Sequence, residues 1–295
     1  MKRTGYIAIV GRPNVGKSTL LNAIIGEKVA IVSSKPQTTR NRIIGIETRG
    51  EDQFVFLDTP GMHRPQNSLG DFMVKTANST MQDADAVILV IDASKEITAV
   101  EEKVIEYLKL SGTPAILAVN KTDLAEREKI METLAFYSAK HSFAAYVPIC
   151  AKNGKGVDAL LDECSKFLVE GEWLFDGDMI TDQPMRQVVA EIIREKILRT
   201  LNKEVPHGIA VVIEEYTDEE TMVTIRAEIF CEKTSHKGII VGKGGEELKR
   251  VGSYARADIE KLVGKKVYLN LWVKVKENWR DSAKLVSNFG YKEEI

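Results

Sequence analysis

Apolar runs alternate with amphipathic stretches over residues 5–170 of this 295-residue chain. The amphipathic stretches place leucine, isoleucine and valine three and four residues apart, as in residues 17–26, 98–112 and 156–171, which predicts helices. The apolar runs are continuous, as is typical of strands covered by helices on both faces. We therefore predict an α/β domain with a doubly wound, mostly parallel six-stranded sheet. Its strands are expected at residues 6–10, 42–49, 53–58, 84–92, 114–120 and 144–149.

Only a Gly-Glu-Asp turn separates the second expected strand from the third. A connection this short joins antiparallel neighbours, so we expect residues 42–49 to run against the direction of the rest.

The alternation stops after residue 170. Residues 171–184 carry Gly, Asp and Pro without any period, which predicts a linker. The remaining chain predicts helix, two strands, helix, helix and strand, with a glycine-rich loop between the second and third helices. The clearest of these are a helix at 185–201, strands at 207–216 and 221–233, a helix at 246–264 and a strand at 266–276.

The length of 295 residues exceeds one ordinary hydrophobic core and favours two domains. We predict an α/β first domain over 1–172, a linker over 173–183 and an α+β second domain over 184–295, with its core at about 200–278. Hydrophobic content of 44% and charged content of 28% fit a soluble globular protein. The apolar run at the N-terminus is too short for a secretory signal. Three scattered cysteines suggest a reducing compartment and no zinc site.

The first chemical motif is GRPNVGKS at residues 11–18, which matches G-x-x-x-x-G-K-[ST] between a strand and a helix. Such a loop can wrap a phosphate in backbone N–H groups at a helix N-terminus. Lys17 would reach the β- and γ-phosphates, and the Ser18 hydroxyl would ligate Mg²⁺. The expected nucleotide-binding residues here are Gly11, Arg12, Pro13, Asn14, Val15, Gly16, Lys17, Ser18 and Thr19.

A second motif, DTPG, begins at the end of an expected buried strand. Asp58 could hold Mg²⁺ directly or through water, and Gly61 could offer its backbone N–H to the γ-phosphate. Alone this motif also fits an ordinary turn, but forty residues after a phosphate-binding loop it is the expected partner.

Two further motifs indicate which base is bound. In NKTD, the Asp123 carboxylate can accept two hydrogen bonds from guanine, which adenine does not offer. Asn120 would brace the loop, and the Lys121 stem would cover the base. In CAK, the backbone N–H of Ala151 could donate to guanine O6. Cys150 stands where serine is more familiar and is expected to be a packed side chain, and Lys152 completes the motif.

This ordered set resembles the TRAFAC-class GTPases over residues 5–170. The resemblance implies GTP hydrolysis to GDP by in-line attack of water, with Mg²⁺ bound by Ser18, Asp58 and a switch threonine. Thr38 and Thr39 are both candidates, and the pattern P-x-T-T-R of similar bacterial GTPases favours Thr39. Lys17, Thr39 and Gly61 are then the expected catalytic set.

Two positions bear on the hydrolysis rate. Ras-like enzymes orient the attacking water with a glutamine just after D-x-x-G, where this chain has Met62. A thioether cannot orient the water, so backbone, another residue or a partner must do so, and slow intrinsic turnover is expected. Asn14 matches an asparagine that ligates K⁺ in some relatives; an alternative is that Asn14 only shapes the loop.

A later stretch, IIVGKGGEEL at residues 239–248, also joins glycine and lysine. A second nucleotide-binding loop would need glycine at 237 and a hydroxyl at 244, but the chain has Lys237 and Gly244. GKGG instead fits the G-x-x-G loop that clamps single-stranded RNA in KH domains. With its order of helices and strands, the region resembles a type II KH domain. The expected RNA-binding residues are Ile240, Gly242, Lys243, Gly244, Gly245, Lys249 and Arg250.

Charge in this region is polarised. Residues 233–280 hold twelve Lys or Arg against five Asp or Glu, whereas residues 200–232 hold two against eight. The chain's net charge of −2 therefore hides a basic part that contains the glycine loop. Such a patch suits a phosphate backbone, although about half of its lysines are expected to be merely solvated.

A TRAFAC-class GTPase domain joined to a type II KH domain is similar to the Era family. This resemblance implies action in small ribosomal subunit assembly, binding to the single-stranded 3′ end of the small-subunit ribosomal RNA, and a cytoplasmic protein with peripheral contact to the cell membrane. We expect a monomer. Two alternatives stay open: an RNA-binding adaptor with GTP as a structural ligand, and an assembly GTPase whose C-terminal domain binds protein.

Overall fold

The computed structural model describes residues 1–62, 65–96, 98–201 and 208–292. These residues form two compact units. The first unit comprises Met1–Ala30, Thr39–Arg64 and Met73–Asp182, and the second comprises Ile31–Thr38, Pro65–Phe72 and Gln183–Ile295. Two short segments from within the first half of the chain therefore belong to the second unit.

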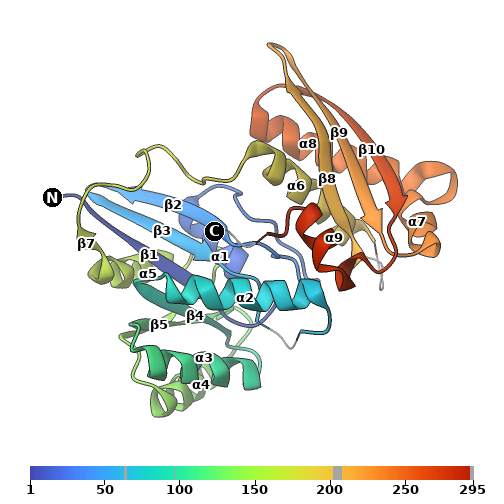
Figure 1. Cartoon of the computed structure of the whole chain (residues 1–295). Coiled ribbons are helices and arrows are strands. Elements are labelled where there is room, and N and C mark those ends of the chain that lie inside the picture. The colour runs from blue at the N-terminus through green and yellow to red at the C-terminus, as the bar shows by residue number, and fades with distance from the viewer. Residues whose placement is uncertain (63–64, 97, 202–207, 293–295) are drawn as a thin grey trace. The chain divides into compact units, whose positions relative to one another are not determined.

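A mixed sheet forms the centre of the first unit, with strand order β2-β3-β1-β4-β5-β6 and β7 paired to β1 (Figure 1). All neighbours are parallel except β2 with β3 and β7 with β1, so the antiparallel second strand is confirmed. The seventh strand was not predicted because two residues carry no period. The strands are β1 (Arg3–Val10), β2 (Ile43–Arg49), β3 (Asp52–Asp58), β4 (Ala86–Asp92), β5 (Ala115–Asn120), β6 (Ala145–Pro148) and β7 (Val169–Glu170).

Helices cover both faces of this sheet, as the continuous apolar strands predicted. Along β1, Ile7 and Ile9 join a buried cluster with α1 and α5, whereas Ala8 and Val10 join one with α2, α3 and α4. Because both faces are apolar, polar groups are confined to the strand ends. The helices are α1 (Lys17–Ile25), α2 (Ser68–Gln82), α3 (Ala99–Ser111), α4 (Arg127–Lys140), α5 (Val157–Cys164) and the 3₁₀ turn η1 (Ser165–Phe167).

The predicted linker has no helix or strand between residues 171 and 184, yet it is held by hydrogen bonds. The buried Gln53 amide accepts from Leu174 N–H at 2.9 Å and donates to the Phe175 carbonyl at 2.8 Å. Further along, the N–H of Ile46 on β2 donates to the Ile180 carbonyl at 2.9 Å. Residues up to Asp182 are therefore packed into the first unit.

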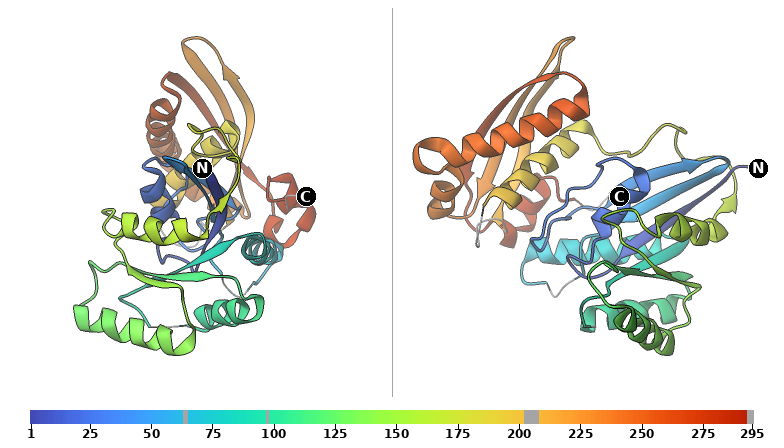
Figure 2. Two further views of the ribbon diagram at one scale, coloured as in Figure 1. Left: turned by 90° about the vertical axis from the view of Figure 1, so that its left-hand side faces the viewer. Right: turned by 180° about the vertical axis from the view of Figure 1, so that it is seen from behind.

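The second unit has the predicted order of helix, two strands, helix, helix and strand. Its sheet has the order β10-β9-β8, with β10 parallel to β9, and α6 and α8 lie on one face (Figure 2). The predicted strand start at His207 lies outside the described residues. The elements are α6 (Met185–Thr200), β8 (Ala210–Asp218), β9 (Met222–Cys231), α7 (Thr234–Val241), η3 (Lys243–Gly245), α8 (Glu246–Val263), β10 (Lys266–Val275), η4 (Trp279–Asp281) and α9 (Ala283–Asn288).

The C-terminal tail packs on this unit through aromatic rings. Trp279 is fully buried and its indole N–H donates to the Gly208 carbonyl at 2.9 Å. Phe289 of the tail stacks on Phe230 of β9 with ring centroids 4.5 Å apart. The tail therefore covers one end of the sheet face that lies opposite α6 and α8.

Residues 31–38 join the second unit through polar contacts with α6. Glu195 accepts the Val32 N–H at 3.0 Å, and Arg199 donates to the Val32 carbonyl at 2.9 and 3.0 Å. Arg194 donates to the Thr38 carbonyl. The residues just before Thr39 are thus bonded along one helix of the C-terminal region.

Candidate nucleotide and nucleic-acid sites

The phosphate-binding loop runs from the end of β1 to the start of α1. Gly16 is the N-cap of α1 with φ of 104°, a left-handed conformation that favours glycine. A Cβ at this position would lie 2.3 Å from Nδ2 of Asn120. No side chain caps the helix, so the N–H groups of its first turn face outward for an external acceptor.

Lys17 is folded over this loop. Its Nζ donates to the carbonyls of Gly11 and Arg12, both at 3.0 Å. Burial lowers the pKa of Lys17 to about 8, and the nearby Asp58 carboxylate opposes this shift. Phosphate oxygens would be stronger partners for the ammonium than carbonyls and would favour its charged form.

Three oxygen-bearing side chains from three segments meet beside the start of α1. Ser18 Oγ donates to Asp58 Oδ2 at 2.7 Å and lies 2.8 Å from Thr39 Oγ1, which is 3.5 Å from the same carboxylate oxygen. Thr38 instead donates to the Lys35 carbonyl at 2.6 Å. Of the two candidate switch threonines, the structure brings Thr39 to the site.

Asp58 makes this cluster suited to a cation. It is fully buried, and its Oδ1 has no hydrogen-bond partner among the described residues. Burial raises the pKa of Asp58 to about 6, against the effect of Lys17, Ser18 and Thr39. An orphaned buried carboxylate oxygen next to two hydroxyls fits Mg²⁺, which prefers hard oxygen ligands. Ser18, Thr39 and Asp58 are the residues that would hold it.

The DTPG segment lies against the phosphate-binding loop. The N–H of Met62, next to Gly61, donates to the Gly11 carbonyl at 3.3 Å. The Met62 side chain packs on the apolar cluster formed by β1, β4 and the helices beneath them. The side chain is partly buried there, and its thioether is too weak a hydrogen-bonding group to orient a water molecule.

The NKTD motif follows β5 and supports two neighbouring loops. The buried Asn120 donates to the Val15 carbonyl at 2.8 Å, as expected of a brace, and Lys121 Nζ donates to the Asn14 carbonyl at 2.7 Å. Asp123 accepts a hydrogen bond from the Cys150 thiol at 3.2 Å. The buried Cys150 thus positions the carboxylate expected to recognise guanine.

The CAK motif differs from expectation in one bond. The Ala151 N–H, expected to donate to guanine O6, donates to Asn120 Oδ1 at 3.0 Å. To donate to guanine O6, the Ala151 N–H would have to leave Asn120 Oδ1 or be shared between the two acceptors. The Lys152 side chain is exposed.

Two contacts near this site escaped the sequence-based prediction. Asp92, at the end of β4, binds Lys121 Nζ at 2.8 Å. Burial raises the pKa of Asp92, but hydrogen bonds from Lys121 and Ser94 bring it below its usual range. The Arg12 guanidinium lies 3.2 Å from the buried Glu101, so Arg12 faces α3 and offers a nucleotide only its backbone. An acidic residue ending an apolar strand was the available clue to Asp92.

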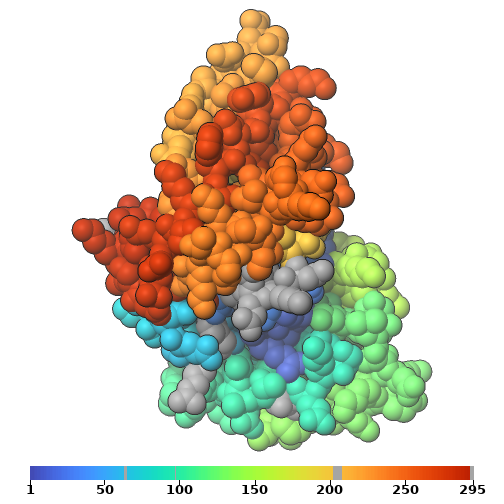
Figure 3. Space-filling model, turned by 90° about the vertical axis from the view of Figure 1, so that its right-hand side faces the viewer, coloured from blue at the N-terminus to red at the C-terminus, as the bar shows by residue number. Residues whose placement is uncertain are grey.

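The GKGG loop connects α7 to α8 on the part of the surface coloured orange in Figure 3. Gly242 has φ of 75°, and a Cβ there would lie 2.9 Å from the backbone N of Glu247. Gly245 is the N-cap of α8, again without a side-chain cap. Lys243 and Lys249 are exposed, and the half-exposed Arg250 pairs with Glu247 at 2.6 Å. This loop presents backbone N–H groups and cations without a hydroxyl or a buried carboxylate.

One predicted RNA contact needs correction. Ile240 is fully buried within the core of the second unit, so its side chain cannot touch a bound strand. The neighbouring Ile239 is 47% exposed. A helical turn of about 100° per residue places the two side chains on different sides of α7, which the apolar pattern alone did not resolve.

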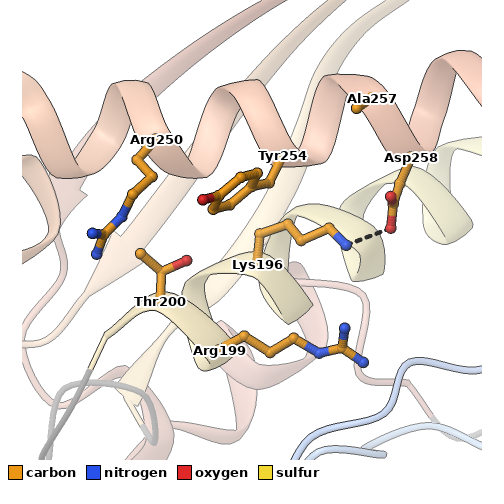
Figure 4. A pocket seen from close by; sticks show the side chains of 7 residues that line it. All are labelled: Lys196, Arg199, Thr200, Arg250, Tyr254, Ala257 and Asp258. Carbon is orange, nitrogen blue, oxygen red and sulfur yellow. Dashed lines mark hydrogen bonds and ion pairs between the residues drawn. The ribbon is translucent and has the colours of Figure 1, made fainter.

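A hollow of about 440 Å³ between α6 and α8 gathers basic residues but is not an anion site (Figure 4). Lys196 pairs with Asp258, as the dashed line shows, and Arg199 pairs with Glu195 at 3.0 Å. Arg250, which also lines the hollow, is paired with Glu247. Carboxylates thus offset its three cations.

Known protein families match both parts of the chain, the part with the nucleotide site and the part with the GKGG loop. Residues 6–121 match the family of 50S ribosome-binding GTPases, and residues 204–280 match the KH domain family. The chain is 49% identical over 294 residues to GTPase Era of Clostridioides difficile (strain 630), with 99% of each chain covered. The chain belongs to the Era family of GTPases. It is also 50% identical to GTPase Era of Clostridium kluyveri over 293 residues, covering 99% of this chain and all of that one.

Solved Era structures share the fold of the whole chain. One is Era in complex with MgGDPNP and nucleotides 1506–1542 of 16S ribosomal RNA, with a TM-score of 0.95, 40% identity and 99% of each chain covered. Another is a variant of Aquifex aeolicus Era bound to GDP.AlF4−, with a TM-score of 0.94, 41% identity and coverage of 98% and 99%. In the part of this chain that the structure describes, no helix is long and apolar enough to cross a membrane.

Proposed function

We propose that this Era-family GTPase hydrolyses GTP at the first site and binds the single-stranded 3′ end of small-subunit ribosomal RNA at the GKGG loop, acting in assembly of the small ribosomal subunit. The convergence of Ser18, Thr39 and Asp58 from three segments carries the hydrolytic part. The Era complex with MgGDPNP and 16S ribosomal RNA supports the RNA part by similarity.

The residues of the first site have distinct roles in this proposal. The N–H groups at the start of α1 and the Lys17 ammonium hold the β- and γ-phosphates, and Gly61 donates its N–H to the γ-phosphate. Asp123 accepts from the guanine edge, with Cys150 holding its orientation. When bound, Mg²⁺ supplies charge neutralisation on the phosphates. Positioning thus provides most of the rate enhancement.

The attacking water has no partner in the Met62 side chain, which packs on the core. Slow turnover in the absence of a partner follows. K⁺ near Asn14 is one source of additional positive charge, while a purely structural role of Asn14, which has a left-handed backbone, is the alternative. Turnover in K⁺ buffer that exceeds turnover in Na⁺ buffer supports the first role, and equal rates remove it.

The two sites form one switch in this proposal. Thr39 responds to the γ-phosphate, and the residues directly before it, 31–38, belong to the second compact unit. A displacement of Thr39 on hydrolysis would therefore change the hydrogen bonds that Arg194 and Arg199 donate to the carbonyls of this segment. A cytoplasmic location with peripheral membrane contact, a monomeric state and domain boundaries at 172 and 184 are also part of the proposal.

Turnover measured with and without cognate RNA tests the function. RNA-stimulated release of phosphate that is lost in Asp58→Asn supports it. No turnover under either condition, with RNA binding intact, favours the second candidate, an RNA-binding adaptor with GTP as a structural ligand. The observation that keeps this candidate is the packing of the Met62 side chain on the apolar cluster, which leaves that position without a group to orient the water.

A further inference from the structure

The three-stranded sheet of the second unit has one face that α6 and α8 leave uncovered (Figures 1 and 2). On the edge strand β10, alternate residues point to this face and read Lys266, Tyr268, Asn270, Trp272 and Lys274. Of the residues between them, Val267 and Val273 are buried in the core, and Leu269 and Leu271 are partly buried against it. The open face of β10 therefore presents two aromatic rings with an amide between them, and a lysine at each end of the row.

The two rings in this row are exposed, unlike the other aromatic residues around them. Tyr268 is 56% and Trp272 60% exposed, and among the described residues neither ring stacks on another. At the covered end of the same face, by contrast, Phe230 stacks on Phe289. The tail thus buries one end of the sheet face and leaves the two rings of β10 in solvent.

Their spacing limits the kind of ligand. Four residues along a strand separate the rings by about 13 Å. Stacked aromatic partners have centroids no more than about 7 Å apart, so one planar group cannot stack on both. A ligand that occupies both rings must carry repeated planar groups along a chain, as single-stranded nucleic acid does.

Charge on the face is graded across the strands. On β9 and β8, Arg226 pairs with Glu215 at 3.5 Å, and Glu228 pairs with Lys274 of β10. The β8 edge also carries the exposed Glu214. The β10 row itself contains only basic and neutral residues, and Glu228, which lies opposite Trp272, is paired with Lys274. A polyanion is therefore favoured along β10 over the acidic β8 edge.

We propose that Tyr268 and Trp272 form a stacking platform for bases of single-stranded RNA beyond those held at the GKGG loop. This rests on the proposed RNA-binding function. Helix α7, which leads into that loop, packs on β10, so a strand clamped there lies beside this edge of the sheet. Lys266 then contacts a phosphate beside Tyr268, Lys274 contacts one beside Trp272 in exchange for its pair with Glu228, and the Asn270 amide lies between the rings.

The test uses the full chain and fluorescently labelled RNA oligomers from about four nucleotides, the length a KH groove holds, to about sixteen. Affinity should rise with length in the wild type. Tyr268→Ala and Trp272→Ala should each lower the affinity for the longer oligomers by about tenfold and leave the shortest unchanged. Tyr268→Phe and Trp272→Phe, which keep a ring, should retain the gain with length.

Tyr254→Ala is the matched control, because Tyr254 is 55% exposed on α8, and it should not alter the gain with length. Thermal unfolding confirms that each variant is folded. If the Tyr268→Ala/Trp272→Ala double variant binds every length as the wild type does, or loses affinity equally at all lengths, the platform is excluded and a protein partner becomes the better occupant. If the wild type binds no RNA of any length, the proposed function itself fails.

Discussion

Two loops of this chain place a lysine beside a left-handed glycine at the start of a helix, and they differ in what surrounds that lysine. At the first, Lys17 is buried and bonded to loop carbonyls, with Ser18, Thr39 and Asp58 alongside. At the second, Lys243 is exposed, and Gly244 stands where Ser18 stands in the first. Both helices lack a side-chain cap.

The shared part is backbone that can approach phosphate, because uncapped N–H groups at a helix start bind anions in either loop. The difference is the oxygen cluster that accompanies a cation. A buried carboxylate oxygen without a hydrogen-bond partner suits a Mg²⁺–nucleotide held in a fixed position. An exposed lysine on a basic surface suits the phosphate backbone of a nucleic-acid strand at the protein surface. The neighbouring side chains, more than the glycines, determine the ligand.

The largest expected effect separates the two lysines. Lys17→Ala should lower kcat/KM for GTP by about 10³-fold, because the variant lacks the buried ammonium that stabilises the negative charge developing on the phosphates in the transition state. Single-turnover phosphate release measures this. Lys243→Ala, the matched change in the second loop, should leave turnover without RNA as it is in the wild type. Equal losses in the two variants would mean that the loops are not functionally distinct.

The next largest effect is expected when negative charge is introduced into the GKGG loop. Changing both Gly242 and Gly245 to Asp should weaken RNA binding on the order of 100-fold, since carboxylates would face phosphates. A Cβ at Gly242 would also meet the backbone of Glu247. Crosslinking to short RNA tails measures the loss, and Gly171→Asp, at an open position in the first unit, is the control for added charge. Unchanged RNA binding in the double variant would defeat the KH assignment.

A smaller effect is expected where the first site is braced by Asp92. Asp92→Asn removes the ionic partner of Lys121 and should weaken GDP binding about tenfold, the usual consequence of losing a hydrogen bond between charged groups. Equilibrium binding of a fluorescent GDP derivative measures it. Asp178→Asn, an exposed change in the segment after β7, should bind as the wild type does, and the same result for Asp92→Asn would remove its bracing role.

The smallest effect concerns the thiol beside Asp123. Cys150→Ser keeps a donor and should change guanine nucleotide affinity by about twofold or less, whereas Cys150→Ala removes the donor and should weaken it about fivefold. Titration with GDP and with ADP compares base selectivity in both variants. Identical affinities for the alanine and serine variants would show that the thiol does not position Asp123.

Local pattern was sufficient to predict the fold of both halves. Continuous apolar runs fixed the buried strands, and the Gly-Glu-Asp turn fixed the antiparallel β2. Periodicity could not show that residues 31–38 and 65–72 join the second unit, because their contacts to α6 and the tail link positions more than 150 residues apart.

Site residues were predictable where they belong to a short sequence motif with fixed spacing. The residues of the phosphate-binding loop, DTPG and NKTD were all expected from sequence. The side-chain partners of Arg12 and Asp92 were not, because an ion pair between distant segments leaves no local pattern. The burial of Ile240 beside the exposed Ile239 depends on the rotation of α7 on its sheet. Five polar or glycine residues followed by three apolar ones do not define this rotation.

The most direct test of two loops with different ligands and one function is GTP turnover measured with and without single-stranded ribosomal RNA tails, in the wild type and in the Gly242→Asp/Gly245→Asp variant. We expect equal slow turnover of both proteins without RNA, and acceleration by RNA in the wild type alone. Turnover that RNA leaves unchanged in the wild type, or that RNA accelerates equally in the variant, would contradict this expectation.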